Sequence, residues 1–356
     1  MVVGETDRPV VALVLAGGTG SRLYPASRSD RPKQFLSLLG EDSLLARTVD
    51  RARDVADEVF VSTRPAFAAD VPDHAPDAEV VVEPAAKDTG PALVYATHRI
   101  RDAVGDCVVV VLPSDHRVGG AFADVMRRGA RVAAETDALV TFGVEPTRPD
   151  TGYGYIEPGA SRGDYAPVAA FHEKPDAETA RAYVDAGHYW NAGIFAWTPD
   201  ALLAAARDSP LSDLVADLAA GVDAERAFEG VPAVSVDYGV MERTANAVVV
   251  PASFEWDDLG SWDAFDRVRD GDGGGESADD GSESAGDDGT VSVGDVTVRT
   301  LDAADNVVAG DDVHVSLVGV SDLAVVSWDD RVLVVPKDRA QDVRTLVDEL
   351  KRRGEF

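Results

Sequence analysis

Five continuous apolar runs constrain the fold of this chain most strongly, because they alternate with stretches of helical periodicity. The runs are rich in valine and cover residues 10–15, 59–61, 80–82, 108–112 and 139–144. The helix-period stretches lie near 43–57, 90–104 and 120–135. This alternation is typical of a layered α/β sheet, and unbroken apolar runs indicate strands that are covered on both faces. We therefore expect a doubly wound sheet that binds ligands beyond the carboxyl ends of its strands.

A glycine-rich loop follows the first apolar run. It carries Gly17, Gly18 and Gly20, and two cationic residues, Arg22 and Lys33, come soon after it. Glycines let backbone amides approach phosphate oxygens closely, and the two cations supply the charge-assisted contacts that a polyphosphate needs. We interpret this loop as a cradle for a nucleoside triphosphate.

The spacing of the loop excludes two common phosphate-binding patterns. The Walker pattern is absent, and residues 18–23 lack the third glycine of a dinucleotide fingerprint. Instead, residues 17–25 and 32–36 resemble the GGxGxRLxP and PKQFL motifs of sugar-phosphate nucleotidyltransferases, in particular the mannose-1-phosphate guanylyltransferase branch. The resemblance implies a Rossmann-like mixed α/β sheet that transfers a guanylyl group from GTP to mannose 1-phosphate, with Mg²⁺ as cofactor.

In this reaction the glycine-rich loop would bind the nucleotide. The resemblance places its glycines and Ser21 against the triphosphate. Arg22 would hold the leaving pyrophosphate, and Lys33 would stabilise the charge that develops at the α-phosphate.

A carboxylate follows the apolar run 108–112, three residues beyond its end. Asp115 at this position could bind Mg²⁺ through oxygen, or could simply form a turn. The resemblance makes it a metal ligand and takes a second ligand, Asp258, from a Trp-x-Asp-x-Gly-Ser-Trp segment. A register error of one residue would exchange Asp258 with Asp257. For His116 we expect a structural role.

Two segments resemble the sugar-binding motifs FxEKP and WNAGIF of this family, at residues 171–175 and 190–195. The resemblance implies that Glu173 accepts hydrogen bonds from sugar hydroxyls and that Lys174 contacts the sugar phosphate. A surface ion pair between these two residues is the alternative. Asn191 would hydrogen-bond the sugar.

Two further positions are expected at the sugar. Gly154, in a glycine and tyrosine loop, would contact the hexose through its backbone, while Tyr153 and Tyr155 can be structural. Asp237 lies in a segment that resembles IDYxVMEK and would orient the hexose or a neighbouring group.

The segment expected to bind the nucleobase departs from the family pattern EPxxRNTAPA. The differences fall at three positions, Lys87, Asp88 and Gly90. A carboxylate such as Glu83 or Asp88 could accept hydrogen bonds from N1 and N2 of guanine. Asp88 could instead cap a helix that begins at Pro91, so the choice of base stays open.

The charge of the chain is strongly negative. It has 64 acidic and 33 basic residues and a formal net charge of −31, which argues against a nucleic-acid partner. Only five of the basic residues are lysines. Acidic residues along the whole chain favour a halophile with a concentrated-salt cytosol over an ordinary acidic protein. No secretory or membrane-spanning run is visible, so we expect a cytoplasmic protein without a membrane partner.

Composition also predicts the domain boundaries. Residues 1–270 form the expected catalytic domain and residues 271–290 an acidic, glycine-rich linker, for which a calcium loop is the alternative. Short valine-rich strands in 291–356 predict a small β-helix-like domain that could mediate a homodimer. Its terminal helix is expected to pack through one apolar face, formed by Val343, Leu346, Val347 and Leu350.

The remaining alternatives concern other functions. Cys107 is the single cysteine of the sequence, which excludes disulfides. Because it lies in an apolar run, we expect it to pack in the core. The rival activities are transfer to another hexose 1-phosphate, such as glucose 1-phosphate with dTTP or UTP, a noncatalytic GDP-sugar-binding regulatory subunit, and a dinucleotide dehydrogenase. We expect no fused isomerase activity, because little sequence follows the predicted linker.

Overall fold

The computed structural model describes residues 6–269 and 288–356. The predicted linker and its alternative, the calcium loop, therefore lie almost entirely outside the described residues. The chain forms two compact units, and we call them the sheet unit and the β-helix unit. The sheet unit comprises residues 1–17, 48–114 and 118–256, and the β-helix unit comprises residues 18–47, 115–117 and 257–356.

The sheet unit is built around a sheet whose described part has nine strands, in the order β3-β2-β1-β4-β9-β6-β10-β8-β7. The strands are β1 (Val10–Leu15), β2 (Glu58–Thr63), β3 (Glu79–Val82), β4 (Val108–Pro113), β6 (Leu139–Val144), β7 (Tyr155–Pro158), β8 (Ala166–His172), β9 (Tyr189–Trp197) and β10 (Ala247–Ala252). Strands β1 to β4 are parallel to one another, whereas β9 runs antiparallel to both β4 and β6. The expected mixed sheet is confirmed.

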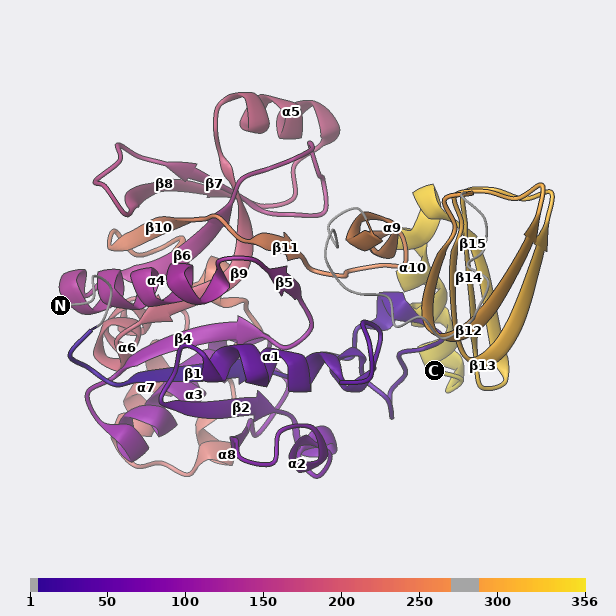
Figure 1. Cartoon of the computed structure of the whole chain (residues 1–356). Coiled ribbons are helices and arrows are strands. Elements are labelled where there is room, and N and C mark those ends of the chain that lie inside the picture. The colour runs from indigo at the N-terminus through magenta and orange to yellow at the C-terminus, as the bar shows by residue number, and fades with distance from the viewer. Residues whose placement is uncertain (1–5, 270–287) are drawn as a thin grey trace. The chain divides into compact units, whose positions relative to one another are not determined.

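Helices cover both faces of this sheet. They are α1 (Leu44–Arg53), α2 (Val71–His74), α3 (Thr89–Val104), α4 (Phe122–Thr136), α5 (Ala177–Asp185), α6 (Pro199–Arg207), α7 (Ser212–Ala219) and α8 (Ala224–Ala227). Alternate residues of β1 (Val11, Leu13) and β4 (Val109, Val111) pack with α3, α6 and α7 in one apolar cluster. Helix α4 packs against β4, β6, β9 and β10 (Figure 1). Cys107 is fully buried in that cluster, as expected, and burial raises the pKa of its thiol to about 11.

The register of β1 and β4 determines where the loops of the site leave the sheet. Leu15 at the end of β1 lies opposite Pro113 at the end of β4. Because the two strands are parallel, the chain continues from both of them at the same edge of the sheet. A separate two-stranded sheet joins β5 (Arg117–Gly119) to β11 (Glu255–Asp257).

The β-helix unit contains three parallel strands followed by an antiparallel one. The strands are β12 (Val291–Leu301), β13 (Val307–Val318), β14 (Leu323–Trp328) and β15 (Arg331–Pro336), and the helices are α9 (Ala264–Arg269) and α10 (Val343–Arg353). This unit also contains the short 3-10 helices η1 (Ser21–Leu23), η2 (Lys33–Phe35) and η5 (Lys337–Asp342). Leu23 and Leu36 share an apolar cluster with Val307 and Trp328. The segment that follows the glycine-rich loop is therefore part of the core of this unit.

The terminal helix packs on its own unit through a narrower face than expected. Val343 and Val347 are buried, and Leu350 packs against the same cluster. Leu346 is 39% exposed, so the expectation that it shares this face is wrong. At 100° per residue, Leu346 falls at the edge of the stripe that the other three side chains define.

Candidate active site

The ammonium group of Lys33 connects the two segments that are expected to bind metal. Its Nζ donates to Oδ2 of Asp115 at 2.9 Å and to the backbone carbonyl of Asp258 at 2.7 Å. The Lys33 side chain is only 4% exposed. A buried lysine needs such partners, because an unpaired ammonium loses its hydration without compensation. We call these three residues the lysine–aspartate cluster, and all of them belong to the β-helix unit.

The cluster keeps its carboxylate ionised. Burial by itself would raise the pKa of Asp115, but the ammonium of Lys33, followed by His116, outweighs it and holds that pKa below its usual range. Burial lowers the pKa of His116, although Asp115 and Asp258 oppose that shift. The His116 imidazole is therefore neutral at pH 7, with Nε2 3.9 Å from Asp115.

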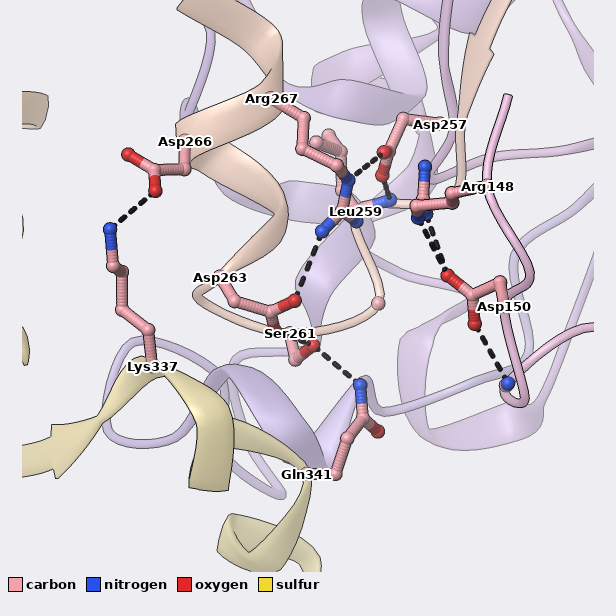
Figure 2. A network of polar contacts seen from close by, with 12 residues as sticks. Arg148, Asp150, Asp257, Leu259, Ser261, Asp263, Asp266, Arg267, Lys337 and Gln341 are labelled. Carbon is pink, nitrogen blue, oxygen red and sulfur yellow. Dashed lines mark hydrogen bonds and ion pairs between the residues drawn. The ribbon is translucent and has the colours of Figure 1, made fainter. Parts of the chain in front are cut away.

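The structure separates the roles of the two adjacent aspartates. Asp257 is 7% exposed, and its carboxylate accepts hydrogen bonds from the backbone N–H of Leu259 and from Nε of Arg267, which Figure 2 shows. These hydrogen bonds hold the Asp257 carboxylate against the loop before α9. The Asp258 carboxylate instead accepts from the nearby backbone N–H of Gly260, at 3.1 Å.

The same loop is joined to the C-terminal part of its unit. Ser261 accepts a hydrogen bond from Nε2 of Gln341, and Asp266 pairs with Lys337 (Figure 2). Gln341 also accepts a hydrogen bond from Arg22, at 2.9 Å. The residues after β15 thus contact both the loop that carries Asp258 and the 3-10 helix that carries Ser21 and Arg22.

Gly20 supports the position of Lys33. Its φ of +65° is unfavourable for other residues, and a Cβ at this position would lie 2.3 Å from the Cβ of Lys33. By contrast, no atom would lie within 4 Å of a Cβ on Gly18. The third glycine, Gly17, belongs to the sheet unit, where a Cβ would lie 2.8 Å from Oε1 of Glu83.

Three residues expected at the sugar form one hydrogen-bond network in the sheet unit. Asn191 donates from Nδ2 to Oδ1 of Asp237 at 2.7 Å, and its backbone N–H donates to the carbonyl of Gly154 at 2.9 Å. Burial raises the pKa of Asp237, and the hydrogen bond from Asn191 partly opposes this shift. Asp237 begins a π-helical turn, η4 (Asp237–Met241), which positions its carboxylate.

Glu173 and Lys174 form an ion pair with each other. The Glu173 and Lys174 side chains are 67% and 61% exposed. They therefore form a surface ion pair, which is the alternative named in the sequence analysis. Glu173 also lies beside Gly154, because a Cβ there would be 3.4 Å from Oε2 of Glu173. The Tyr153 ring packs edge to face against Trp190, with ring centroids 5.1 Å apart.

The two carboxylates expected at the base have different environments. Glu83 is 6% exposed, and burial raises its pKa to about 7, although Arg64 lowers it in part. Asp88 caps α3, since its Oδ1 accepts from the backbone N–H of Thr89 at 2.7 Å. The helix therefore begins at Thr89 and not at Pro91.

The sequence analysis missed Thr141. Its hydroxyl donates to Oδ1 of Asn191 at 3.3 Å and so helps to orient the amide toward Asp237. The signal was present, because this threonine interrupts the apolar run 139–144 and is fully buried. Arg64 beside Glu83 had no comparable signal.

The predicted site residues divide between the two units. The β-helix unit holds Gly18, Gly20, Ser21, Arg22, Lys33, Asp115 and Asp258, and the sheet unit holds Gly17, Glu83, Asp88, Gly154, Glu173, Lys174, Asn191 and Asp237. The expected phosphate and metal residues lie in the first unit, apart from Gly17 and Lys174, and the residues expected at the sugar and the base lie in the second. Over the described ranges, no helix has the length and apolar character to cross a membrane.

Two family profiles match this chain. The profile of the nucleotidyl transferase family matches residues 11–272, and that of the MannoseP isomerase/GMP-like beta-helix domain matches residues 296–350. The second match confirms the expected β-helix-like domain.

Several relatives are similar over nearly the whole chain. The mannose-1-phosphate guanylyltransferase ManC of Salmonella typhimurium is 36% identical over 99% of this chain and 75% of its own length. The xanthan biosynthesis protein XanB of Xanthomonas campestris is 37% identical over 97% of this chain and 74% of its own length. A solved Thermus thermophilus protein, described as a mannose-1-phosphate geranyltransferase, is 34% identical and superposes with a TM-score of 0.87 over 96% of this chain and 99% of that chain. The chain therefore belongs to the nucleotidyl transferase family, on the branch of the mannose-1-phosphate guanylyltransferases.

Proposed function

We propose that this chain transfers a guanylyl group from GTP to mannose 1-phosphate and forms GDP-mannose and pyrophosphate, with Mg²⁺ as cofactor. The observation that carries the proposal is the lysine–aspartate cluster, in which one buried ammonium contacts Asp115 and the backbone of Asp258. It occurs in a chain that resembles mannose-1-phosphate guanylyltransferases over nearly its full length.

The donor set of the cluster suits Mg²⁺. Asp115 is ionised and its side chain is 35% exposed, and Asp258 offers a second carboxylate in the same unit. Magnesium favours one or two carboxylates and takes its other ligands from water and substrate phosphates. When bound here, the ion would neutralise phosphate charge.

The chemistry is one substitution at phosphorus. An oxygen of the sugar phosphate forms a bond to the α-phosphorus of GTP, and the bond from that phosphorus to the bridging oxygen breaks, which releases pyrophosphate. The nucleophile needs no base, because a phosphate monoester with a second pKa of about 6 is already a dianion at pH 7. The protein therefore has to position two anions and neutralise their charge. In this proposal Lys33 acts at the α-phosphate and Arg22 at the pyrophosphate.

The network of Asn191 and Asp237 is proposed to hold the hexose. The hydrogen bond between the two side chains fixes the amide, so that the remaining oxygens of Asp237 and Glu173 can accept from sugar hydroxyls. Lys174 would exchange its partner from Glu173 to the sugar phosphate. This exchange costs little, because an exposed ion pair contributes at most about 1 kcal/mol.

Glu83 is proposed to select guanine. With a pKa of about 7 it is partly ionised at neutral pH, and in its ionised form the carboxylate can accept from both N1–H and N2–H of guanine, a pair of donors that uracil and thymine lack. Asp88 has a weaker claim, because its carboxylate already caps α3.

The test measures pyrophosphate release in 2 M KCl with Mg²⁺, across GTP, ATP, UTP and dTTP and across mannose, glucose and galactose 1-phosphates. We expect the highest kcat/KM for GTP with mannose 1-phosphate. A preference for UTP or dTTP with glucose 1-phosphate would establish the rival transferase. Nucleotide binding without any pyrophosphate release would favour the regulatory subunit.

A substitution in the cluster tests its role. We expect Asp115→Asn to lower kcat by a factor of about 100 to 1,000, the usual effect of losing one preorganised electrostatic contact. Asp348→Asn, on the exposed side of α10, removes the same charge elsewhere in this unit and is the control. If the Asp115→Asn variant turned over about as fast as wild type, Asp115 would not be a ligand of the catalytic metal.

A further inference from the structure

A second group of potential metal ligands lies in the sheet unit, among residues that the proposed reaction does not use. Glu157, His172 and His188 each offer one ligand atom, and these atoms all lie within 4.8 Å of one another. Nε2 of His172 is 3.4 Å from Oε2 of Glu157, and Nε2 of His188 is 3.9 Å from the same oxygen. We call these residues the histidine–glutamate cluster.

The strand register brings the three residues together. In the pairing of β7 with β8, Tyr155 lies opposite His172, and Glu157 is two residues further along the same face of β7. On its other side β7 pairs with β9, where Ile156 lies opposite Tyr189. Continuing this antiparallel register by one residue places His188 opposite Glu157. Glu157 therefore lies next to one histidine at the end of β8 and one directly before β9.

The two imidazoles are held in place by an aromatic side chain of α5. The Tyr183 ring stacks on His172 at 4.5 Å and on His188 at 4.7 Å between centroids. Stacking restricts the rotation of both imidazoles, so less entropy is lost when a ligand binds them.

His188 lacks the hydrogen bonds that a buried imidazole normally makes. Its side chain is nine-tenths buried, and Nδ1 has no partner in the described part of the chain. Its Nε2 is too far from Glu157 for a hydrogen bond. A cation between Nε2 and the Glu157 carboxylate would give Nε2 the partner that it lacks.

We propose that Glu157, His172 and His188 bind one divalent transition-metal ion, for which Zn²⁺ is the best fit. Two imidazoles and a carboxylate are a common ligand set for zinc, with a remaining position for water. Tetrahedral zinc at usual bond lengths separates its ligand atoms by about 3.4 Å. The distance from His172 to Glu157 already has this value, and His188 would have to move closer to both, from 3.9 Å to Glu157 and from within 4.8 Å of His172. Mg²⁺ does not compete effectively, because it prefers a shell of oxygens.

The bound ion would fix the strands that carry the sugar-side residues. Gly154 directly precedes β7, Glu173 directly follows β8, and Asn191 lies on β9. A cation held by one residue from each of these segments would join all three. The site is therefore expected to stabilise this part of the sheet unit, independently of the reaction proposed above.

The experiment uses the full chain after removal of metal by a chelator, in 2 M KCl. Zn²⁺ is titrated in competition with a chromogenic chelator, and Co²⁺ is added separately to record its visible absorption bands. We expect one equivalent of zinc per chain, a cobalt spectrum typical of nitrogen and oxygen ligands, and a higher melting temperature with zinc.

Substitutions of the ligands distinguish a built site from adventitious binding. His172→Gln, His188→Gln and Glu157→Gln should each weaken zinc binding by more than about 100-fold, since even the loss of an outer partner costs 10- to 100-fold. His98→Gln is the matched control, because His98 lies 3.3 Å from the carboxylate of Asp102 in a pair that includes no second histidine. Glu157 is half exposed, so its variant should fold even if the histidine variants do not.

The outcomes are distinct. Retention of one tight zinc in the control and its loss in the three variants would support the site. Absence of stoichiometric zinc in wild type, or unchanged zinc binding by Glu157→Gln, would contradict it and leave the two imidazoles and Tyr183 as a packing cluster only.

Discussion

Lys33 can occupy its buried position because residue 20 is a glycine. The left-handed backbone there brings the main chain against the Lys33 side chain, and a Cβ would overlap it. The ammonium group is thereby directed to Asp115 and to the carbonyl of Asp258. Gly20 thus has a structural role besides the phosphate contact proposed for it.

Gly20→Ala should therefore displace Lys33 and lower kcat by at least about 10-fold, because small errors in position are costly in catalysis. The control is Gly319→Ala, since Gly319 has nearly the same φ, +66°, but no atom within 4 Å of a Cβ. Both variants carry backbone strain of about 1 kcal/mol, and only the first carries the overlap. Equal activity of the two variants would contradict this explanation.

The buried carboxyl of Glu83 should leave a signature in the pH dependence of stability. Its pKa is about 7 in the folded chain, above the usual value of 4.5, because burial disfavours the charge. Between these values the folded state retains a proton that the unfolded state releases. The contribution of Glu83 to stability is therefore complete below pH 4.5, is lost as pH rises to about 7, and is constant above it.

Glu83→Gln should remove this dependence. We expect the difference in unfolding free energy between wild type and variant to change by about 3 kcal/mol over that interval, measured by urea unfolding in 2 M KCl. Glu229→Gln, at an exposed position, is the control and should show no such change. A flat difference for Glu83→Gln would mean that its carboxyl titrates normally.

At the scale of elements, α10 supports the segment that carries Arg22. Val343 and Val347 share an apolar cluster with Leu23, the last residue of η1. Truncation of a buried valine removes part of this contact. We therefore expect Val347→Ala to destabilise the β-helix unit by about 2 kcal/mol.

The neighbouring residue provides the control for this substitution. Leu346→Ala removes a larger but exposed side chain, and it should change the urea midpoint little. If both substitutions shifted the midpoint equally, α10 would not pack as described.

The elements themselves could be predicted from the sequence, because valine runs and helical periods are local signals. The strands β1 to β4 and β6 match the five predicted runs, and the β-helix-like domain was expected from its short strands. The contacts of the site are not local. Lys33 and Asp115 are 82 residues apart, and Asn191 and Asp237 are 46 residues apart. Only the family resemblance suggested that such residues act together.

The histidine–glutamate cluster likewise could not be predicted from the sequence. Glu157, His172 and His188 have no metal-binding spacing in the sequence, and no family motif includes all three. They meet only because β7 lies between β8 and β9 in register. Strand pairing of this kind depends on the whole sheet, so no local sequence pattern predicts it.

At the scale of the whole molecule, the net charge of −31 opposes folding through self-repulsion. Salt screens this repulsion, since the Debye length falls from about 10 Å at 0.1 M to about 3 Å at 1 M. We propose that the chain is adapted to concentrated salt and expect its melting temperature to rise steeply between 0.1 and 2 M KCl. Sucrose, which stabilises without screening, is the control. Equal melting temperatures at both KCl concentrations would contradict this adaptation.

The central claim is that the chain moves the α-phosphate of GTP onto mannose 1-phosphate. The most direct test incubates the enzyme with GTP labelled at the α-phosphorus, mannose 1-phosphate and Mg²⁺, and separates the products. We expect all transferred label in GDP-mannose, no label in the pyrophosphate, and equal amounts of the two products. Label that stays in GTP, or that appears as GMP without addition to the sugar phosphate, would contradict it.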